Sequence, residues 1–175
     1  MSMHPRLSEL LRYIDDQAAE LRATYQAVPA DRVDQRPAEG SWSPAEVMHH
    51  VVIVERRLAP LFGRLIAQAR SIGPERDESP LLPVIRPQRF ASRERRVVTA
   101  EAFEPRDTNV ATLLTDFDAV RAVLRDVIVT GDGFALGEVS ASHPALGTLT
   151  GYEWIAFIGS HEARHAAQIR EAMSS

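Results

Sequence analysis

The sequence His161-Glu162-Ala163-Arg164-His165-Ala166-Ala167-Gln168-Ile169 holds two histidines four positions apart. On an α-helix, residues at this spacing lie on one face, about one turn from each other. Both imidazoles can therefore reach the same point, as the ligands of a metal ion do. The pattern predicts a helix from Tyr152 to Met173 that carries two ligands of a metal site, and the rest of the chain is expected to bring at least one more.

Apolar residues at steps of three and four predict four long helices, and no strand pattern is present. The first helix extends from Arg6 to about Val28, and the third from about Thr108 to the residue before Gly131. The last helix follows Thr150-Gly151-Tyr152-Glu153, which has capping-box spacing. The positions expected to be buried on the first helix are Leu7, Leu10, Leu11, Ile14, Ala18, Leu21 and Tyr25.

The second helix has a clear start signal in Ser43-Pro44-Ala45-Glu46. Serine is a preferred cap, proline fits the first helical position, and a glutamate three residues after the cap completes a capping box. We expect this helix to end near Ile72-Gly73-Pro74 and to bend at Pro60, which lacks a backbone donor. Its expected buried stripe is Val47, Val51, Val54, Leu58, Leu61 and Leu65.

Residues 73–106 contain five prolines and no sustained periodicity, so they are predicted to form a long connection in which Val97 and Val98 are extended. Residues 133–151 are predicted to be a second loop. Four long helices without strands or repeats indicate an all-α four-helix bundle. The first loop can cross the length of the bundle, so we expect a long crossover connection between the second and third helices.

Length and composition are those of one globular domain over residues 1–175. The net charge of −4 gives no indication of a nucleic-acid partner. The absence of cysteine excludes disulfides, thiolate nucleophiles and thiolate metal ligands, so any metal must bind to His, Asp or Glu. No signal-peptide pattern and no apolar run of membrane-spanning length is present, so we expect a cytoplasmic protein without membrane contact.

A third ligand is needed, because two histidines rarely suffice for a metal site in a protein. His49 and His50 lie on the second predicted helix. Position 50 is three residues after Val47 and four before Val54, inside the apolar stripe, whereas position 49 lies beside it. The spacing therefore predicts that His50 points inward and His49 outward.

His50, His161 and His165 are thus the predicted metal ligands. The alternative is three separate buried histidines, each with its own hydrogen-bond partner. A shared cation removes the desolvation cost of all three together, which favours the metal hypothesis. Imidazole suits zinc, nickel, copper and iron, and we expect zinc or nickel. Three protein ligands leave a coordination position open, as in catalytic sites.

The same stretch matches H-E-x-x-H, the signature of zinc metalloproteases in which the glutamate is the general base. The context disfavours a protease, because few residues follow His165 and no strand offers an edge for an extended peptide. Glu162 is kept as the candidate catalytic base, although a solvated helix glutamate is the favoured interpretation.

The other polar residues are interpreted as structural, supporting or solvent-exposed residues. His143 is interpreted as a turn residue rather than a cap on the cavity, and His4 as solvated. Gln168 shares the histidine stripe and is either a support for the metal ligands or a residue at the edge of the core. Arg164 is expected to pair with an acidic neighbour. The arginine-rich loop 86–96 is expected to be solvated or ion-paired; its arginines are Arg86, Arg89, Arg93, Arg95 and Arg96.

Several of these stretches together resemble the DinB-like (YfiT-like) superfamily. They are the run from Trp42 to His50, the run from His143 to Gly147, Glu153-Trp154, and the run from His161 to Ile169. The resemblance covers essentially the whole chain. It implies a four-helix bundle with a long crossover and a three-histidine metal site, and it places the family's histidines on His50, His161 and His165.

Two functional hypotheses follow. Some relatives in this superfamily use the metal to activate low-molecular-weight thiols, and others resemble hydrolases. The first hypothesis is a metal-dependent enzyme that activates water or a thiol cosubstrate toward a small molecule. The second is a non-catalytic, stress-related bundle that binds a metal or ligand. A homodimer formed through the outer helix faces is also expected.

Overall fold

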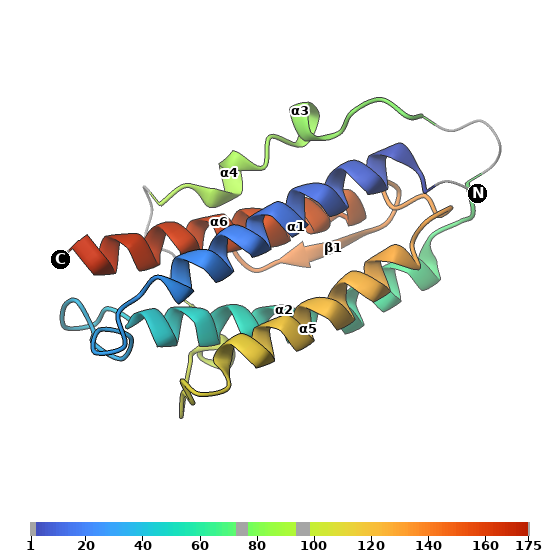
Figure 1. Ribbon diagram of the computed structural model, residues 1–175. Coiled ribbons are helices and arrows are strands. Elements are labelled where there is room, and N and C mark those ends of the chain that lie inside the picture. Colours follow the sequence, from blue (N-terminus) through green and yellow to red (C-terminus); the bar gives the residue numbers. More distant parts are fainter. Residues whose placement is uncertain (1–2, 73–76, 94–98, 175) are drawn as a thin grey trace.

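The computed structural model describes residues 3–72, 77–93 and 99–174. Four long helices form a bundle, as predicted (Figure 1): α1 (Pro5–Gln26), α2 (Pro44–Gln68), α5 (Leu113–Val129) and α6 (Gly151–Ser174). The shorter elements are α3 (Leu82–Ile85), α4 (Gln88–Ala91), the 3-10 helix η1 (Glu101–Phe103) and the strands β1 (Ser140–His143) and β2 (Gly147–Thr150). Within the described residues, none of the helices combines the length and apolarity needed to cross a membrane.

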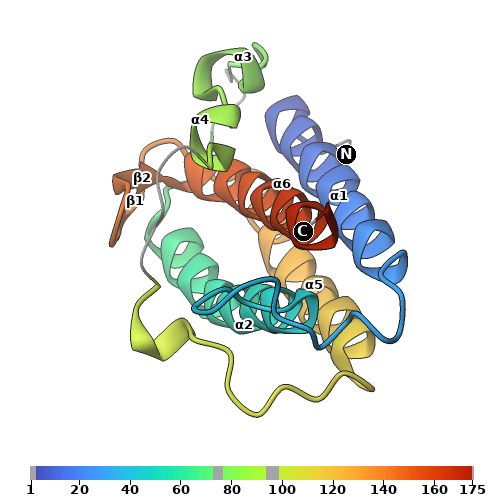
Figure 2. The ribbon, with the colours of Figure 1, turned by 90° about the vertical axis from the view of Figure 1, so that its left-hand side faces the viewer.

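The first and last long helices lie side by side and run in the same direction. Near the middle of α1, the Tyr13 hydroxyl lies 3.2 Å from the hydroxyl of Ser160 on α6. Further along both helices, Glu20 forms an ion pair with Arg170. Residue numbers increase together in these two pairs, which makes α1 and α6 parallel neighbours (Figure 2).

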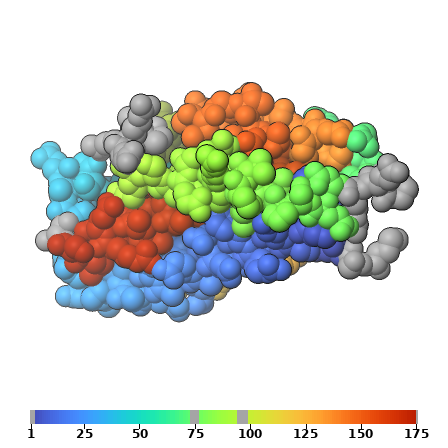
Figure 3. Space-filling view, turned by 90° about the horizontal axis from the view of Figure 1, so that it is seen from above, coloured from blue at the N-terminus to red at the C-terminus, as the bar shows by residue number. Residues whose placement is uncertain are grey.

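The middle pair is parallel as well. Arg121 on α5 lies 3.9 Å from Glu55 on α2, and beyond both helix ends Ser71 forms an isolated β-bridge with Phe134. The end of α2 and the start of α5 therefore lie at opposite ends of the bundle. Residues 77–93 lie on the face over α1 and α6, where Figure 3 shows them in green.

The first predicted helix agrees closely with the structure. All seven positions expected to be buried on it are buried in α1. His4 differs from the prediction: it was expected to be solvated, but it is 2% exposed. Its Nδ1 accepts a hydrogen bond from the Arg6 backbone N–H, so this histidine caps the start of the helix and its ring is held against the protein.

The second helix starts as predicted and ends earlier. Ser43 Oγ accepts from the Glu46 backbone N–H, and the Glu46 carboxylate accepts from the Ser43 N–H, which completes the capping box. The helix ends at Gln68 instead of near Ile72, because the following residues bond to the segment after α5. Gly73 and Pro74 lie outside the described residues.

Two further predictions need correction. The third helix begins at Leu113, since residues 109–112 form a turn instead of the first helical turn. Residues 133–151 are not a loop throughout, because β1 and β2 form an antiparallel hairpin with Ala141 opposite Leu149. Gly147 adopts a left-handed conformation at φ 78°, which favours glycine and allows this tight turn. Strands of four residues are too short to give a clear alternation in the sequence.

The buried apolar side chains form two clusters, one toward each end of the bundle. The first contains Leu7 to Ile14 of α1 and Phe62 of α2, and the second contains Ala18 to Tyr25 of α1 and Ile169 of α6. On α1, α5 and α6 the two clusters are separated by a few residues, whereas on α2 only Ile53 lies between Val52 of the second cluster and Val54 of the first. Near this boundary, polar side chains from several helices meet inside the bundle.

Gly159 permits the close approach of α1 and α6. A Cβ at this position would lie 2.6 Å from Cε1 of Tyr13, whereas a Cβ at Gly63 on α2 would meet nothing within 4 Å. We expect Gly159→Ala to destabilise the protein, because overpacking costs about 1–3 kcal/mol and outweighs the helix propensity of alanine. Gly63→Ala should instead stabilise it by up to about 1 kcal/mol.

Urea unfolding of both variants measures this difference in the free energy of unfolding. Equal stabilisation by the two substitutions would show that Tyr13 moves aside at no cost and that the close contact is unimportant.

Candidate metal centre

Three histidines from two helices converge near the boundary between the two apolar clusters. His50 comes from α2, and His161 and His165 come from α6. His161 Nε2 lies 3.3 Å from His50 Nε2 and 3.1 Å from His165 Nε2. One ring nitrogen from each residue lies within 4.8 Å of the other two, so the group could hold a metal ion. His50 and His165 are each 6% exposed, while His161 is partly exposed.

The hydrogen bonds of the outer ring nitrogens fix two of the imidazoles. His50 Nδ1 lies 2.8 Å from the carbonyl oxygen of Phe103 in η1, and His165 Nδ1 lies 2.9 Å from Gln168 Oε1. These oxygens only accept, so each Nδ1 carries the proton and donates it. A neutral imidazole protonated at Nδ1 presents the lone pair of its Nε2. His50 and His165 therefore direct two lone pairs to the point where His161 Nε2 also lies.

The surroundings keep these rings neutral. Burial lowers the pKa of His161 well below its ordinary value, and the charges of His165 and His50 lower it further. Burial likewise lowers the pKa of His165 well below the ordinary value, while the hydrogen bond to Gln168 opposes this shift. The pKa of His50 is lowered by burial too, against the effect of the Phe103 carbonyl. Neutral imidazole is the form that binds metal ions.

The donor set fits a divalent transition metal. Two fixed lone pairs and the Nε2 of His161 face one point, where a cation can bind all three nitrogens, whereas a single proton can be shared by only two of them. Both fixed rings also have the outer partners that metal-binding histidines usually have, namely a backbone carbonyl and a side-chain oxygen. The arrangement matches a site with three protein ligands and an open coordination position.

Gln168 supports His165, one of the two interpretations that its position in the sequence allowed. We expect Gln168→Leu to weaken metal affinity by about 10–100-fold, the usual effect of losing an outer partner of a ligand. Gln168→Glu keeps an acceptor for the Nδ1 proton and should retain the native affinity. Competition with a chromophoric chelator measures both variants, and a native affinity in Gln168→Leu would remove this role.

A surface pocket of about 320 Å³ has no histidine in its lining but contains residues that contact the histidines. Trp42 and Gln168 contribute to its lining, together with Arg93 of the crossing connection. The Trp42 ring lies 5.0 Å from the His50 ring, and Gln168 contacts His165, so its walls touch two of the three histidines. A small molecule bound in this pocket would lie next to the metal centre.

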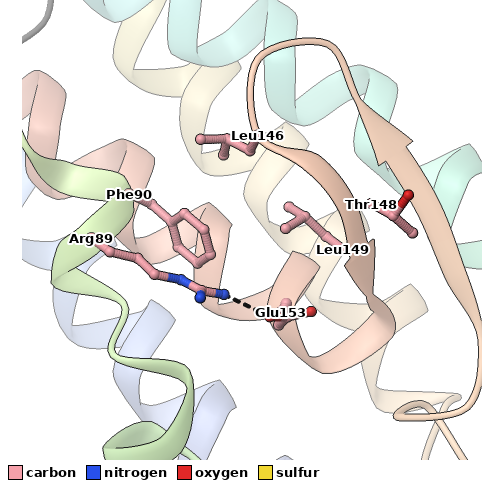
Figure 4. A pocket seen from close by; sticks show the side chains of 6 residues that line it. All are labelled: Arg89, Phe90, Leu146, Thr148, Leu149 and Glu153. Carbon is pink, nitrogen blue, oxygen red and sulfur yellow. Dashed lines mark hydrogen bonds and ion pairs between the residues drawn. The ribbon is translucent and has the colours of Figure 1, made fainter.

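A second pocket, of about 350 Å³, lies between α4, the hairpin and the start of α6 (Figure 4). The ion pair between Arg89 and Glu153, at 2.6 Å, crosses it. No histidine lines it. Phe90 in its wall packs edge-on against Phe157, and Phe157 lies 5.3 Å from the His161 ring. The aromatic ring of Phe157 therefore separates this pocket from the metal centre.

The remaining histidines lie outside the group. His49 points away from it, as predicted, and its Nδ1 lies 2.9 Å from Thr108 Oγ1. His143 stands at the end of β1, where its Nδ1 accepts from the backbone N–H groups of Ala145 and Leu146. It is therefore a turn residue as expected, and its ring also packs 4.7 Å from that of Phe157.

Glu162 is the largest correction to the sequence analysis. It was interpreted as a solvated glutamate, but it is 0% exposed. Its carboxylate faces Arg121 of α5 at 3.6 Å and lies near Glu55 of α2. The residue that the H-E-x-x-H signature makes a general base is thus directed toward a buried guanidinium.

The sequence analysis missed Arg121 and Glu55. Arg121 occupies a buried position of α5, four residues after Phe117 and three before Leu124. A charged residue at such a position of an apolar stripe is itself a signal, because charges are rarely buried unless they are paired. Glu55 is likewise buried on α2, beside Val54.

Of the three arginines that the structure describes in the arginine-rich loop, Arg86 is exposed and the other two are ion-paired. Arg89 pairs with Glu153, and Arg93 pairs with Glu171 at 2.5 Å. Arg164 donates a hydrogen bond to the carbonyl oxygen of Ser92. Burial lowers the pKa of its guanidinium, and the negative charge of Glu171 opposes this shift. Arg95 and Arg96, and the extended pair expected at Val97 and Val98, lie outside the described residues.

Comparison with known proteins agrees with this architecture. No curated protein sequence matches the chain. Among solved structures, TT2238, described as a four-helix bundle protein, is 19% identical, covers 94% of this chain and 98% of its own, and gives a TM-score of 0.60. YfiT from Bacillus subtilis, described as a probable metal-dependent hydrolase with an unusual four-helix bundle topology, is 12% identical. That match covers 99% of this chain and 89% of YfiT, with a TM-score of 0.61. The model of the DinB superfamily matches residues 13–169, and the chain therefore belongs to that superfamily.

Proposed function

We propose that this protein is a metal-dependent enzyme in which His50, His161 and His165 hold a divalent zinc or nickel ion. The convergence of their three Nε2 atoms, with two lone pairs fixed by outer hydrogen bonds, carries the proposal. YfiT, a structural neighbour, is described as a probable metal-dependent hydrolase, which supports the same class of chemistry here. Three protein ligands leave room at the metal for one reactant.

The proposed reaction is hydrolysis or thiol transfer on a small molecule. A divalent ion in such a site lowers the pKa of a bound water to about 7 or holds a thiol as its thiolate. The chain has no cysteine, so a reacting thiol would arrive as a low-molecular-weight cosubstrate. The pocket beside Trp42 and Gln168 has a volume near the lower end of the range for small-molecule sites, which is about 300–1,000 Å³.

The chain's own residues orient the ligands and shape the access to them. The Phe103 carbonyl and Gln168 Oε1 hold the protons of His50 and His165 on the outer nitrogens. The rings of Trp42 and Phe157 lie against His50 and His161, respectively, and exclude water from those sides of the centre.

Two measurements test the proposal on protein purified without a histidine tag. Elemental analysis should find about one divalent metal ion per chain, and turnover of ester, epoxide or thiol-acceptor substrates should stop after chelation and return with metal. His165→Ala should abolish turnover with little change in melting temperature. A native protein that turns over none of these substrates, together with a large loss of melting temperature in His165→Ala, would favour a non-catalytic metal-binding bundle.

A further inference from the structure

A buried charged cluster lies in the bundle beside the histidines. Glu55, Arg121 and Glu162 are 1%, 7% and 0% exposed. The Arg121 guanidinium lies 3.6 Å from the Glu162 carboxylate and 3.9 Å from that of Glu55. A third carboxylate, that of Asp15 on α1, lies 3.9 Å from it. These four residues, called the polar cluster below, come from all four long helices.

The polar cluster interrupts the apolar interior. On α1 the first apolar cluster ends at Ile14 and the second begins at Ala18, so Asp15 lies between them. Arg121 lies between Phe117 and Leu124 in the same way, and Glu162 falls between Ile158 and Ala166. His161 and His165 occupy this interval of α6 too. The cluster therefore lies beside two of the three predicted metal ligands.

The polar cluster is a costly way to fill a core. The side-chain nitrogens of Arg121 and the carboxylate oxygens of Glu55 and Glu162 have no direct hydrogen bond of normal geometry to another described residue. Apolar side chains of similar volume in place of such buried ions are often as stable or more stable. Stability alone therefore does not account for these residues.

The positions of these charged residues can instead be explained by a role in aligning α2 with α6. Glu55 lies on α2 five residues after His50, and Glu162 lies on α6 directly after His161. A slip of α2 along α6 by one turn moves the helices by about 5.4 Å. Apolar stripes can repack after such a slip, whereas carboxylates from both helices would then leave the shared guanidinium. Buried polar groups that fix register at a cost in stability are known from coiled coils.

We propose that Arg121 is a positioning residue that fixes the register of α2 against α6, so that His50 meets His161 and His165. It acts through Glu55 and Glu162 and touches neither the metal nor a substrate. The consequence for metal binding rests on the metal site proposed above, whereas the register itself is a property of the metal-free protein.

The test compares three variants. Arg121→Met removes only the guanidinium and leaves two buried carboxylates together. The triple variant Glu55→Met, Arg121→Met and Glu162→Met replaces the cluster with apolar side chains of similar length. Arg22→Met is the matched control, because the exposed pair of Arg22 with Asp118 also joins two long helices, α1 and α5, without contacting the cluster.

Helix register is measured without metal. The chain has no cysteine, so Arg64→Cys on α2 and Ser174→Cys on α6, both at exposed positions, can carry two unique spin labels. The distance distribution between the labels should be narrow in the native background and in Arg22→Met. It should broaden or shift in Arg121→Met and in the triple variant.

Melting temperature and Co²⁺ affinity complete the test. The triple variant should melt at or above the native temperature but bind Co²⁺ at least about 10-fold more weakly, comparable to losing a partner of a metal ligand. Arg121→Met should bind Co²⁺ weakly and also melt earlier. A triple variant with the native distance distribution and native Co²⁺ affinity would refute the role of Arg121. If native protein binds no Co²⁺, the metal function fails, and the distance distribution alone decides the register proposal.

Discussion

His50→Ala is expected to abolish stoichiometric metal binding and the activity that depends on it. His50 is the ligand from α2, so its loss leaves His161 and His165 on a single helix turn. Two histidines rarely hold a metal in a protein. The loss of metal affinity should exceed the 10–100-fold effect expected for an outer partner such as Gln168, and we expect a decrease of about 10³-fold. Elemental analysis and a Co²⁺ titration measure this change.

His49→Ala is the matched control, one residue away on the same helix. His49 points toward Thr108 and away from the centre, so the variant should keep the native metal content. The pair thus separates the role of the inward position from a general effect of removing a histidine from α2. An equal loss of metal in both variants, or in neither, contradicts the assignment of His50.

Phe62→Ala should be the most destabilising of the substitutions considered. Phe62 is 0% exposed within the first apolar cluster, where its ring packs among residues of several elements. Removal of a buried phenylalanine ring costs about 3–5 kcal/mol, because apolar contacts are lost and a cavity remains. For a chain of this size that corresponds to a decrease of about 6–20 °C in melting temperature.

Leu61→Ala provides the comparison. The sequence pattern assigned Leu61 to the buried stripe of the second helix, but the structure leaves it half-buried and turns Phe62 inward. We therefore expect a smaller loss, about 1 kcal/mol, the centre of the distribution for single substitutions. Calorimetry of both variants shows which of the two residues lies on the buried face of α2. A larger loss of stability in Leu61→Ala would support the buried stripe predicted from the sequence.

The helical part of the fold could be predicted because its signals are local. Periodic apolar residues and the Ser43 capping box act within a few turns of one helix, so α1 and the start of α2 agree with the sequence. The hairpin was missed because its strands are short. The end of α2 was missed because it is set by contacts of Ser71 with Phe134, far along the chain.

The proximity of the three histidines could be predicted from the sequence because each lies in an apolar stripe. The surroundings of Glu162 could not, because the partner that buries it, Arg121, comes from another helix. A polar residue next to a metal-ligand histidine gives the same sequence pattern whether it faces solvent, the metal or a buried ion. Only the packing of four helices decides among these environments.

The parallel pairing of the long helices also affects how the protein reaches its folded state. His50 and His161 are 111 residues apart, and α1 pairs with the last long helix instead of with its neighbour in the chain. Contacts of such large sequence separation raise the contact order, and helical proteins with a high contact order fold more slowly than bundles of consecutive hairpins. During synthesis, no complete three-histidine group exists until residue 165 has been added. Metal binding at the proposed site would therefore require that α2 and α6 have already come together, and an early contact of a metal with His50 alone would not fix the native arrangement.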